Sequence, residues 1–233
     1  MRAILVFVIL LLMTSLGASD LMDNIYFDLG VGFGFTSGHE VKVMRSHHRR
    51  HRHHHHHKFE DNAFNGGTAM EFGVRVGHAY DELPMFIVVE FIHSTGNVAT
   101  AESDIPLKML NQRITEFSYS QSFIGPGVVA YMAPNFQLSA AAGFTFGSIE
   151  YNYLYQGVET TISDRINPSF AISLSMAFDF ELFGQKLQAG VGTFSTDFNQ
   201  QGNIKHNASF TGRLFVRYAF YNNARIRAYY NRP

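Results

Sequence analysis

The residues with the clearest capacity for chemistry form one stretch, HHRRHRHHHHHK, at positions 47–58. Neutral imidazole groups bind Zn²⁺, Ni²⁺ or Cu²⁺, whereas arginine and lysine bind phosphates and acidic glycans. The candidate metal ligands are His53, His54, His55, His56 and His57. The candidate anion-binding residues are Arg45, Arg49, Arg50, Arg52 and Lys58. A third reading is a solvated surface segment without a ligand, because a polar, mostly basic run cannot pack a core.

These alternatives differ in their expected response to pH. Below a pH of about 6.5 the histidines become protonated, so that anion binding strengthens while metal binding weakens. A flexible histidine run also lacks the fixed geometry of a dedicated metal site. We therefore expect no resident cofactor, with loosely held Zn²⁺, Ni²⁺ or Cu²⁺ as the alternative. The choice depends on the elements that hold this segment, which we call the histidine tract (47–58).

The N-terminus has the features of an exported protein. Arg2 precedes an apolar run at 3–13, and the small residues Gly17 and Ser19 follow it. This order is typical of a secretory signal peptide, and the run is shorter than the ~20 residues that a transmembrane helix needs. We predict a cleaved signal peptide over 1–19 and a mature chain without disulfides, since cysteine is absent.

The composition is unusual for a soluble exported domain. Charged residues make up 16% of the chain, against a typical value of ~25%. Aromatic residues make up 15%, with 23 Phe and 11 Tyr, and glycine occurs 20 times. The sequence contains no P-loop, dinucleotide-binding or spaced zinc motif, and we expect no nucleic-acid partner. The composition therefore favours a binding or structural class over a cofactor enzyme.

Apolar residues alternate with small or polar residues through most of the mature chain. One face of the segment 24–36 comprises Ile25, Phe27, Leu29, Val31, Phe33 and Phe35. Its other face comprises Tyr26, Asp28, Gly30, Gly32, Gly34 and Thr36. A period of two over twelve residues predicts a β-strand. By this criterion the predicted strands lie at 24–36, 69–78, 85–94, 116–132, 136–147, 169–181, 187–195 and 210–220.

The predicted connections alternate between long and short. The long ones are 37–67, 95–113, 156–167 and 196–207, and the short ones are 81–84, 133–135 and 182–186. Long loops at one end and tight turns at the other are typical of bacterial outer-membrane barrels. The histidine tract then falls in the longest, extracellular connection. Within the fourth strand, Gly125-Pro126-Gly127 predicts a bulge or kink.

The face opposite the apolar one is mainly Gly, Ser and Ala with isolated charges, which suits a narrow interior. In a bilayer every backbone polar group needs a partner, so strands can cross only as a closed barrel. We predict an all-β fold over 20–221, an eight-stranded antiparallel transmembrane β-barrel with long extracellular loops and short periplasmic turns. Its apolar face contacts lipid. The aromatic residues predicted for the interfacial girdles are Tyr131, Phe136, Phe178, Phe180, Tyr218 and Phe220.

The last predicted strand, FTGRLFVRYAF at 210–220, adds a family pattern. Its alternate positions are Gly212, Leu214, Val216, Tyr218 and Phe220. This pattern resembles the C-terminal insertion signal of Gram-negative outer-membrane proteins, which the barrel-assembly machinery recognises. The mature chain resembles the small eight-stranded barrels, namely the opacity-type surface proteins and the membrane domain of outer-membrane protein A. The resemblance implies a Gram-negative outer-membrane location and contact with outer-membrane lipids and lipopolysaccharide.

One feature departs from that family. The aromatic residue usually ends the chain, but here YNNARIRAYYNRP follows Phe220. Residues 222–233 therefore form either a short basic periplasmic tail or part of a different last strand containing RIRAYY.

An eight-stranded barrel is just wide enough for its own side chains to fill, so we expect a plugged interior and no diffusion pore. The candidate interior charges are Asp28, Glu71, Arg75, Glu90, Asp179, Arg213 and Arg217. A tight turn at 81–84 places Arg75 opposite Glu90, and closure of the barrel places Arg217 near Asp28. Because buried unpaired charges are costly, we predict the ion pairs Arg75–Glu90 and Asp28–Arg217.

One further segment, FIHSTG, bears on catalysis. Barrel-type lipid A deacylases place His and Ser two residues apart on one face. Here Thr95 stands two residues after His93, while Ser94 points the other way. With no acidic partner evident, we interpret His93, like His78 near the opposite rim, as interfacial packing and expect no enzyme.

The sequence therefore favours a surface barrel with a structural or surface-interaction role, similar to an adhesin or antigen, for which a host surface ligand is a candidate partner. A narrow porin-like channel and a lipid A-modifying enzyme are the alternatives.

Overall fold

A computed structural model describes ten segments of the chain. These segments are 24–36, 40–43, 61–63, 67–80, 83–98, 112–155, 158–196, 204–207, 210–221 and 223–231. The predicted signal peptide over 1–19 and the histidine tract lie outside the described residues.

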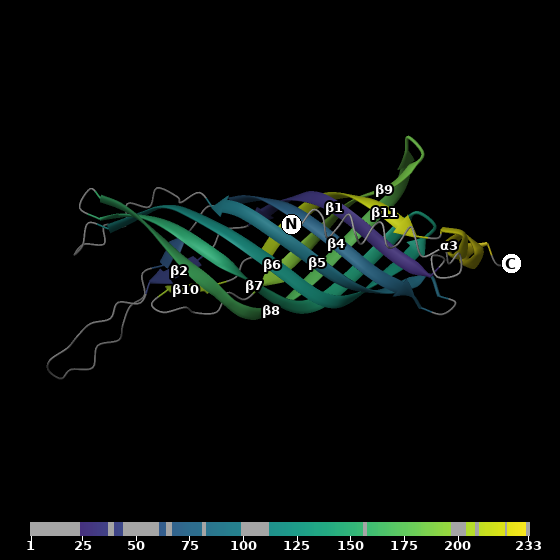
Figure 1. The fold of residues 1–233 in the computed structure, drawn as a ribbon, viewed down its shortest axis with the longest axis horizontal. Coiled ribbons are helices and arrows are strands. Elements are labelled where there is room, and N and C mark those ends of the chain that lie inside the picture. The colour runs from purple at the N-terminus through teal and green to yellow at the C-terminus, as the bar shows by residue number, and fades with distance from the viewer. Residues whose placement is uncertain are drawn as a thin grey trace, which may run out of the picture.

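Among the described residues, eight strands close into an antiparallel barrel (Figure 1). They are β1 (Ile25–Thr36), β4 (Gly67–Ala79), β5 (Met85–Val98), β6 (Gln112–Ala133), β7 (Phe136–Tyr155), β8 (Val158–Leu182), β9 (Gln185–Thr196) and β11 (Phe210–Tyr221). Each strand pairs with the next along the chain, and β11 pairs with β1 to close the barrel. The predicted all-β barrel and its eight strands are confirmed.

The strands are staggered around the barrel. Following the paired residues from Thr95 on β5 once around the wall returns to Met85 on the same strand. Such a stagger accompanies the tilt that a closed barrel requires.

Side chains alternate between the outer surface and the interior. On β8, Leu174 and Met176 are exposed, whereas Ser173 and Ala177 are buried. The same division holds around the barrel, because most of the exposed large hydrophobic residues lie on the outward faces of the barrel strands. So continuous an apolar surface is not expected of a protein in water. Tyr131 is the exception to the predicted girdles, since it is buried inside the barrel.

A helix follows the last barrel strand. It is α3 (Asn223–Tyr230), and it lies at the end of the barrel that carries the short turns (Figure 1). The segment RIRAYY is therefore helical and is not the last strand. Within the described part of the chain, no helix is both long and apolar enough to cross a membrane.

Strands β6, β7 and β8 continue beyond the others at the end opposite α3 (Figure 1). The predicted loop over 156–167 is wrong, because β7 runs to Tyr155 and β8 begins at Val158. Outward side chains such as Glu150 and Ser163 are exposed and polar in this extension. The hydrophobic alternation that reveals a strand is therefore weak there.

The bulge that was one of the two predictions for residues 125–127 is not present. The register between β6 and β7 is the same on both sides of this segment. The nearest register shifts lie between Tyr131 and Ala133 in β6 and between Thr145 and Gly147 in β7. The Gly-Pro-Gly segment stays in an extended strand, where Pro126 lies opposite Val89 of β5.

The described residues include a second sheet of three short strands, at the end of the barrel opposite α3 (Figure 1). Its strands are β2 (Glu40–Val43), β3 (Asp61–Ala63) and β10 (Ile204–Asn207). Lys42 of β2 is paired with Asp61 of β3. The two ends of the segment 44–60, which contains the histidine tract, are therefore held side by side on this sheet.

Candidate functional site

The barrel interior gathers charged side chains from four neighbouring strands. Asp28, Arg75, Glu90 and Arg217 come from β1, β4, β5 and β11, and none is more than 3% exposed. Space for their long side chains comes from small inward residues on β1 and β4, which include Gly30, Gly32 and Gly73. All four were predicted to lie in the interior.

Arg75 and Asp28 form the shortest ion pair of this group. The Nε of Arg75 donates a hydrogen bond to Asp28 Oδ2 over 2.6 Å. The hydroxyl of Tyr26 donates to the same oxygen over 2.6 Å and accepts a hydrogen bond from Arg75 Nη2 over 3.1 Å. The buried carboxylate thus has two donors, which offsets part of its desolvation.

Glu90 holds the other two arginines of the interior. Its Oε1 lies 3.3 Å from Arg217 Nη2 and 3.6 Å from Arg213 Nη2. Arg213 Nη2 also donates to the hydroxyl of Ser173 over 2.8 Å. A longer contact of 3.8 Å between Arg217 Nη1 and Asp28 Oδ1 joins the two halves into one network.

The predicted pair Asp28–Arg217 is present as a contact of 3.8 Å, whereas Arg75 pairs with Asp28 and not with Glu90. Arg75 does lie opposite Glu90 in the register, but it also lies opposite Asp28 on β1, with which it forms its close contact. Arg217 lies opposite Gly30 on β1, so its long side chain can cross the lumen to reach Glu90 on β5. Strand alternation predicts which residues point inward. It does not predict which rotamers long side chains adopt across a lumen.

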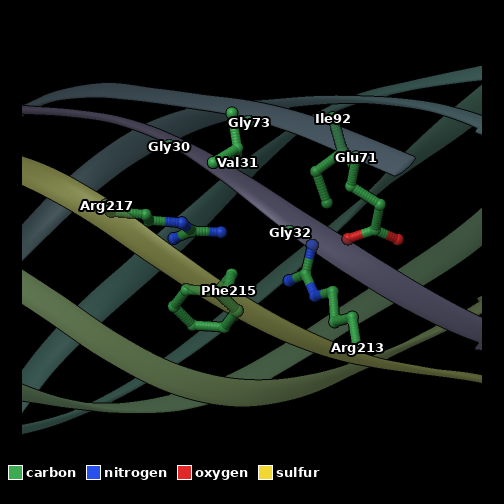
Figure 2. A pocket seen from close by; sticks show the side chains of 9 residues that line it. All are labelled: Gly30, Val31, Gly32, Glu71, Gly73, Ile92, Arg213, Phe215 and Arg217. Atoms are coloured by element: carbon green, nitrogen blue, oxygen red, sulfur yellow. The ribbon is translucent and has the colours of Figure 1, made fainter. Parts of the chain in front are cut away.

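A small pocket adjoins the network (Figure 2). Its lining residues are Gly30, Val31, Gly32, Glu71, Gly73, Ile92, Arg213, Phe215 and Arg217. The cavity has a volume of about 10 Å³, which is room for about one water molecule. Figure 2 shows Glu71 and Arg213 extending toward each other across Gly32. β1 and β11 approach closely here, because a Cβ atom at Gly30 or Gly32 would overlap atoms of β11.

The end of the interior near α3 is filled by aromatic and aliphatic side chains. The largest members of this cluster are Tyr26, Phe86, Tyr131, Tyr221 and Ile226. The ring centroids of Tyr26 and Phe86 lie 4.8 Å apart. Ile226 belongs to α3 and is fully buried, so the helix closes this end of the barrel.

Hydrogen bonds tie this apolar layer to the strands. Asp179 Oδ2 accepts from the hydroxyls of Tyr131 and Tyr221. Gln188 Nε2 donates to the Tyr131 hydroxyl, and the hydroxyl of Tyr230 on α3 donates to the Tyr131 carbonyl over 2.6 Å. Sequence reasoning placed Asp179 inside but missed Tyr131 and Gln188, although Tyr131 has the same phase as Val129, which is also buried.

A second apolar cluster lies further from α3. It comprises Ile92, Phe123, Ala141, Ala171 and Phe194. The rings of Phe123 and Phe194 meet edge to face with centroids 5.3 Å apart. Two apolar layers with an ion-pair network between them therefore fill the described interior. Such an interior can support the barrel wall but offers little to a substrate.

The described outer surface includes a polar cluster beside apolar neighbours. His93 Nδ1 lies 2.9 Å from Ser122 Oγ, and Thr95 Oγ1 lies 3.3 Å from His93 Nε2. Ser94 is buried and points into the barrel, as predicted. Sequence reasoning missed Ser122, because only the register of β5 with β6 brings it beside His93.

The predicted metal and anion sites cannot be placed in this structure. His53–His57, Arg45, Arg49, Arg50, Arg52 and Lys58 all lie outside the described residues. Among the residues that are described, no group of three His, Cys, Asp or Glu side chains could hold a metal ion.

Comparison with known proteins gives a likeness of fold. No protein-family model and no curated protein sequence matches this chain. The outer membrane protein OprG from Pseudomonas aeruginosa has a TM-score of 0.50 at 9% identity, over 84% of this chain and 96% of that chain. At such an identity the similarity concerns the fold alone. It confirms the expected resemblance to small outer-membrane barrels at that level.

Two further solved structures are similar to this chain with lower TM-scores. Ail of Yersinia pestis, in complex with the heparin analogue sucrose octasulfate, has a TM-score of 0.42 at 9% identity, over 82% of this chain and 98% of that chain. The outer membrane protease OmpT from Escherichia coli has a TM-score of 0.45 at 11% identity, over 88% of this chain and 99% of that chain.

Proposed function

We propose that this chain is an outer-membrane surface barrel of a Gram-negative bacterium, with a structural or surface-interaction role. The outward apolar face supports a lipid environment, because water would not be compatible with such a surface. In this proposal a cleaved signal peptide exports the chain, and the barrel-assembly machinery inserts it. Outer-membrane lipids and lipopolysaccharide then surround it.

The filled interior is the single observation that carries the functional part of the proposal. The aromatic layer with Tyr26 and Phe86, the ion pairs of Arg75 and Glu90, and the layer with Phe123 occupy successive levels of the lumen. An open diffusion pore needs a continuous polar channel, as in barrels of sixteen or more strands. We therefore favour a surface role over a narrow porin-like channel.

The loop end of the barrel supplies the interacting element in this proposal. The paired residues Lys42 and Asp61 hold both ends of the segment 44–60 on the small sheet. That sheet lies at the end where β6–β8 extend beyond the other strands (Figure 1). The histidine tract thus departs from the face we assign to the cell exterior, where it can meet a divalent metal ion, an anionic glycolipid or a host surface ligand.

Planar-bilayer recording tests the absence of a pore. We expect the folded barrel in phosphatidylcholine bilayers to give no conductance steps above those of the protein-free membrane. A sixteen-stranded porin incorporated by the same procedure provides the control for incorporation and for sensitivity. Regular open steps from the unaltered chain would favour the channel alternative.

Replacement of the histidine tract tests whether it binds a metal ion or lipopolysaccharide. We would compare the full chain with a variant in which 47–58 is replaced by a Gly/Ser segment of equal length, so that the β2–β3 connection is kept. Binding to immobilised Ni²⁺ and to lipopolysaccharide is measured for both proteins in detergent, at pH values above and below the histidine range. Equal binding by both proteins in both assays would leave the tract without a ligand role.

A lipid-modifying activity has weaker support. The His93 ring contacts hydroxyl groups of Ser122 and Thr95, and no carboxylate is hydrogen-bonded to this histidine in the described part of the chain. The mass of lipid A from cells expressing the wild type or His93→Ala tests this alternative, and we expect identical masses.

A further inference from the structure

We propose that His93, Thr95 and Ser122, here called the His93 cluster, bind the phosphate group of a membrane lipid on the outer wall of the barrel. This inference rests on the proposed function, since it requires that lipid surround the strands. It assigns a class of ligand to the His93 cluster, whose residues belong neither to the barrel interior nor to the histidine tract.

The His93 cluster is built by the register of two neighbouring strands. His93 of β5 lies opposite Ser122 of β6, and Thr95 lies two residues further along β5 on the same outward face. The two ring nitrogens of His93 contact the two hydroxyls over 2.9 Å and 3.3 Å. His93 and Ser122 are half-buried, whereas Thr95 is exposed. The three polar groups thus form one preassembled unit on the wall.

A count of donors shows that at least one O–H group of the His93 cluster is not used within the cluster. A neutral imidazole has one N–H donor and one acceptor nitrogen, and each hydroxyl has one donor. One hydroxyl therefore donates to the ring, while the other accepts from it and keeps its own O–H unused. If the ring is protonated, both hydroxyls accept and both O–H groups remain. In either state the unit has at least one O–H that it can donate to an acceptor oxygen outside the chain.

On β6 this donor lies at the boundary of the apolar surface, whereas on β4 the exposed apolar face continues to Met70, which lies opposite Thr95. Phe72 lies opposite His93 on β4, and Ile124 lies two residues from Ser122 in the direction of α3; both are exposed. On the other side of the cluster, Ser120 continues the outward face of β6, which stays polar through Ser118. The apolar wall that contacts acyl chains is thus continuous with the His93 cluster.

This position determines the class of ligand. A molecule whose acyl chains lie along Ile124 and Phe72 carries its headgroup at the level of the cluster. The strongest hydrogen-bond acceptor in such a headgroup is a phosphate oxygen, because bonds to charged acceptors are shorter and stronger than neutral ones. A phosphorylated lipid of the leaflet at the loop end is therefore the occupant that the geometry supports.

The test measures lipid retained by the folded barrel. The full-length protein is assembled into nanodiscs of the phosphate-free lipid digalactosyldiacylglycerol, doped either with diphosphoryl lipid A or with the same lipid after removal of its phosphates. Protein is then transferred to detergent, and bound lipid A per barrel is counted by mass spectrometry. The variant is Ser122→Ala with Thr95→Val, which removes both hydroxyls from an outward surface. The control is His78→Ala, an exposed outward histidine near the opposite end.

We expect wild type and His78→Ala to retain diphosphoryl lipid A about tenfold more than the double variant does, because one hydrogen bond to a charged group accounts for that factor. Wild type should also retain the dephosphorylated lipid about tenfold less than it retains diphosphoryl lipid A. Equal retention of the two lipids by wild type, or unchanged retention by the double variant, would overturn the proposal. Displacement of lipid A by inorganic phosphate alone would overturn the assignment to a lipid.

Failure of this inference is distinguishable from failure of the proposed function. A chain that is not a membrane barrel would not enter nanodiscs and would show no difference in gel mobility between boiled and unboiled samples. A barrel that enters nanodiscs normally but shows no phosphate-dependent retention would refute only the site at His93.

Discussion

Replacing Glu90 by glutamine tests the ion-pair network that we assign to the barrel core. Glu90 is 2% exposed, and its carboxylate is shared by Arg217 at 3.3 Å and Arg213 at 3.6 Å. Glutamine keeps the shape of the side chain but removes its charge. Glu90→Gln therefore leaves two buried guanidinium groups with the longer contact to Asp28, the hydroxyl of Ser173 and the facing carboxylate of Glu71.

The expected cost follows from the burial of these charges. Breaking a buried ion pair by removing one partner costs about 3–5 kcal/mol, because the remaining charge is left uncompensated in a medium of low dielectric. We place Glu90→Gln in this range. Adding Arg217→Gln to Glu90→Gln removes one of the uncompensated cations. The double variant should therefore lose less free energy of unfolding than the sum of the losses in the two single variants.

The measurement is urea unfolding of the barrel folded in phosphatidylcholine vesicles, followed by the faster-migrating band of unboiled samples on a gel. Glu181→Gln is the control, because Glu181 is exposed at the β8–β9 turn and its replacement should change the free energy of unfolding by at most about 0.5 kcal/mol. A Glu90→Gln barrel within about 1 kcal/mol of the wild type would refute the view that this network stabilises the core.

Three further predictions concern separate parts of the barrel, each measured by the same unfolding assay. Gly30→Ala should destabilise by about 1–3 kcal/mol, since its Cβ would overlap Arg217, whereas Gly73→Ala should be nearly neutral because its nearest non-neighbouring atom lies 3.7 Å away. Phe183→Asn should stabilise by about 1 kcal/mol, because Phe183 has a φ of 52° in a two-residue turn that favours Asn-Gly. Ile226→Ala should cost about 2 kcal/mol and speed tryptic cleavage within α3, because it removes the buried contact of that helix. Unchanged unfolding of Gly30→Ala, Phe183→Asn or Ile226→Ala would contradict the corresponding contact.

Much of the fold is predictable from the sequence because a strand in a membrane barrel has two chemically different faces. The alternation of Phe170, Ile172 and Leu174 with Ala171 and Ser173 specifies both the strand and the side that faces lipid, and the structure has this arrangement. The extension of β6–β8 is not predictable in this way. Above the apolar wall both faces contain polar residues, so the periodicity that identifies a strand is lost.

The candidate sites were less predictable. Alternation specifies that Asp28, Arg75, Glu90 and Arg217 point inward, but their pairing depends on how far each side chain reaches across the lumen. The contact between His93 and Ser122 depends on the register of β5 and β6, which a single sequence does not reveal. Tyr131 was predicted for the outer girdle because it is aromatic and near a strand end, yet its phase directs it inward.

Adjacent single cysteines on β8 test the central claim most directly, since the native chain contains no cysteine. Met176→Cys places a nitroxide label on the outward face, and Ala177→Cys places one in the interior. In lipid vesicles, electron paramagnetic resonance should show the label at 176 relaxed strongly by oxygen and weakly by a water-soluble nickel chelate. The label at 177 should be protected from both agents. A label at 176 that responds mainly to the nickel chelate would contradict a barrel whose apolar face contacts lipid.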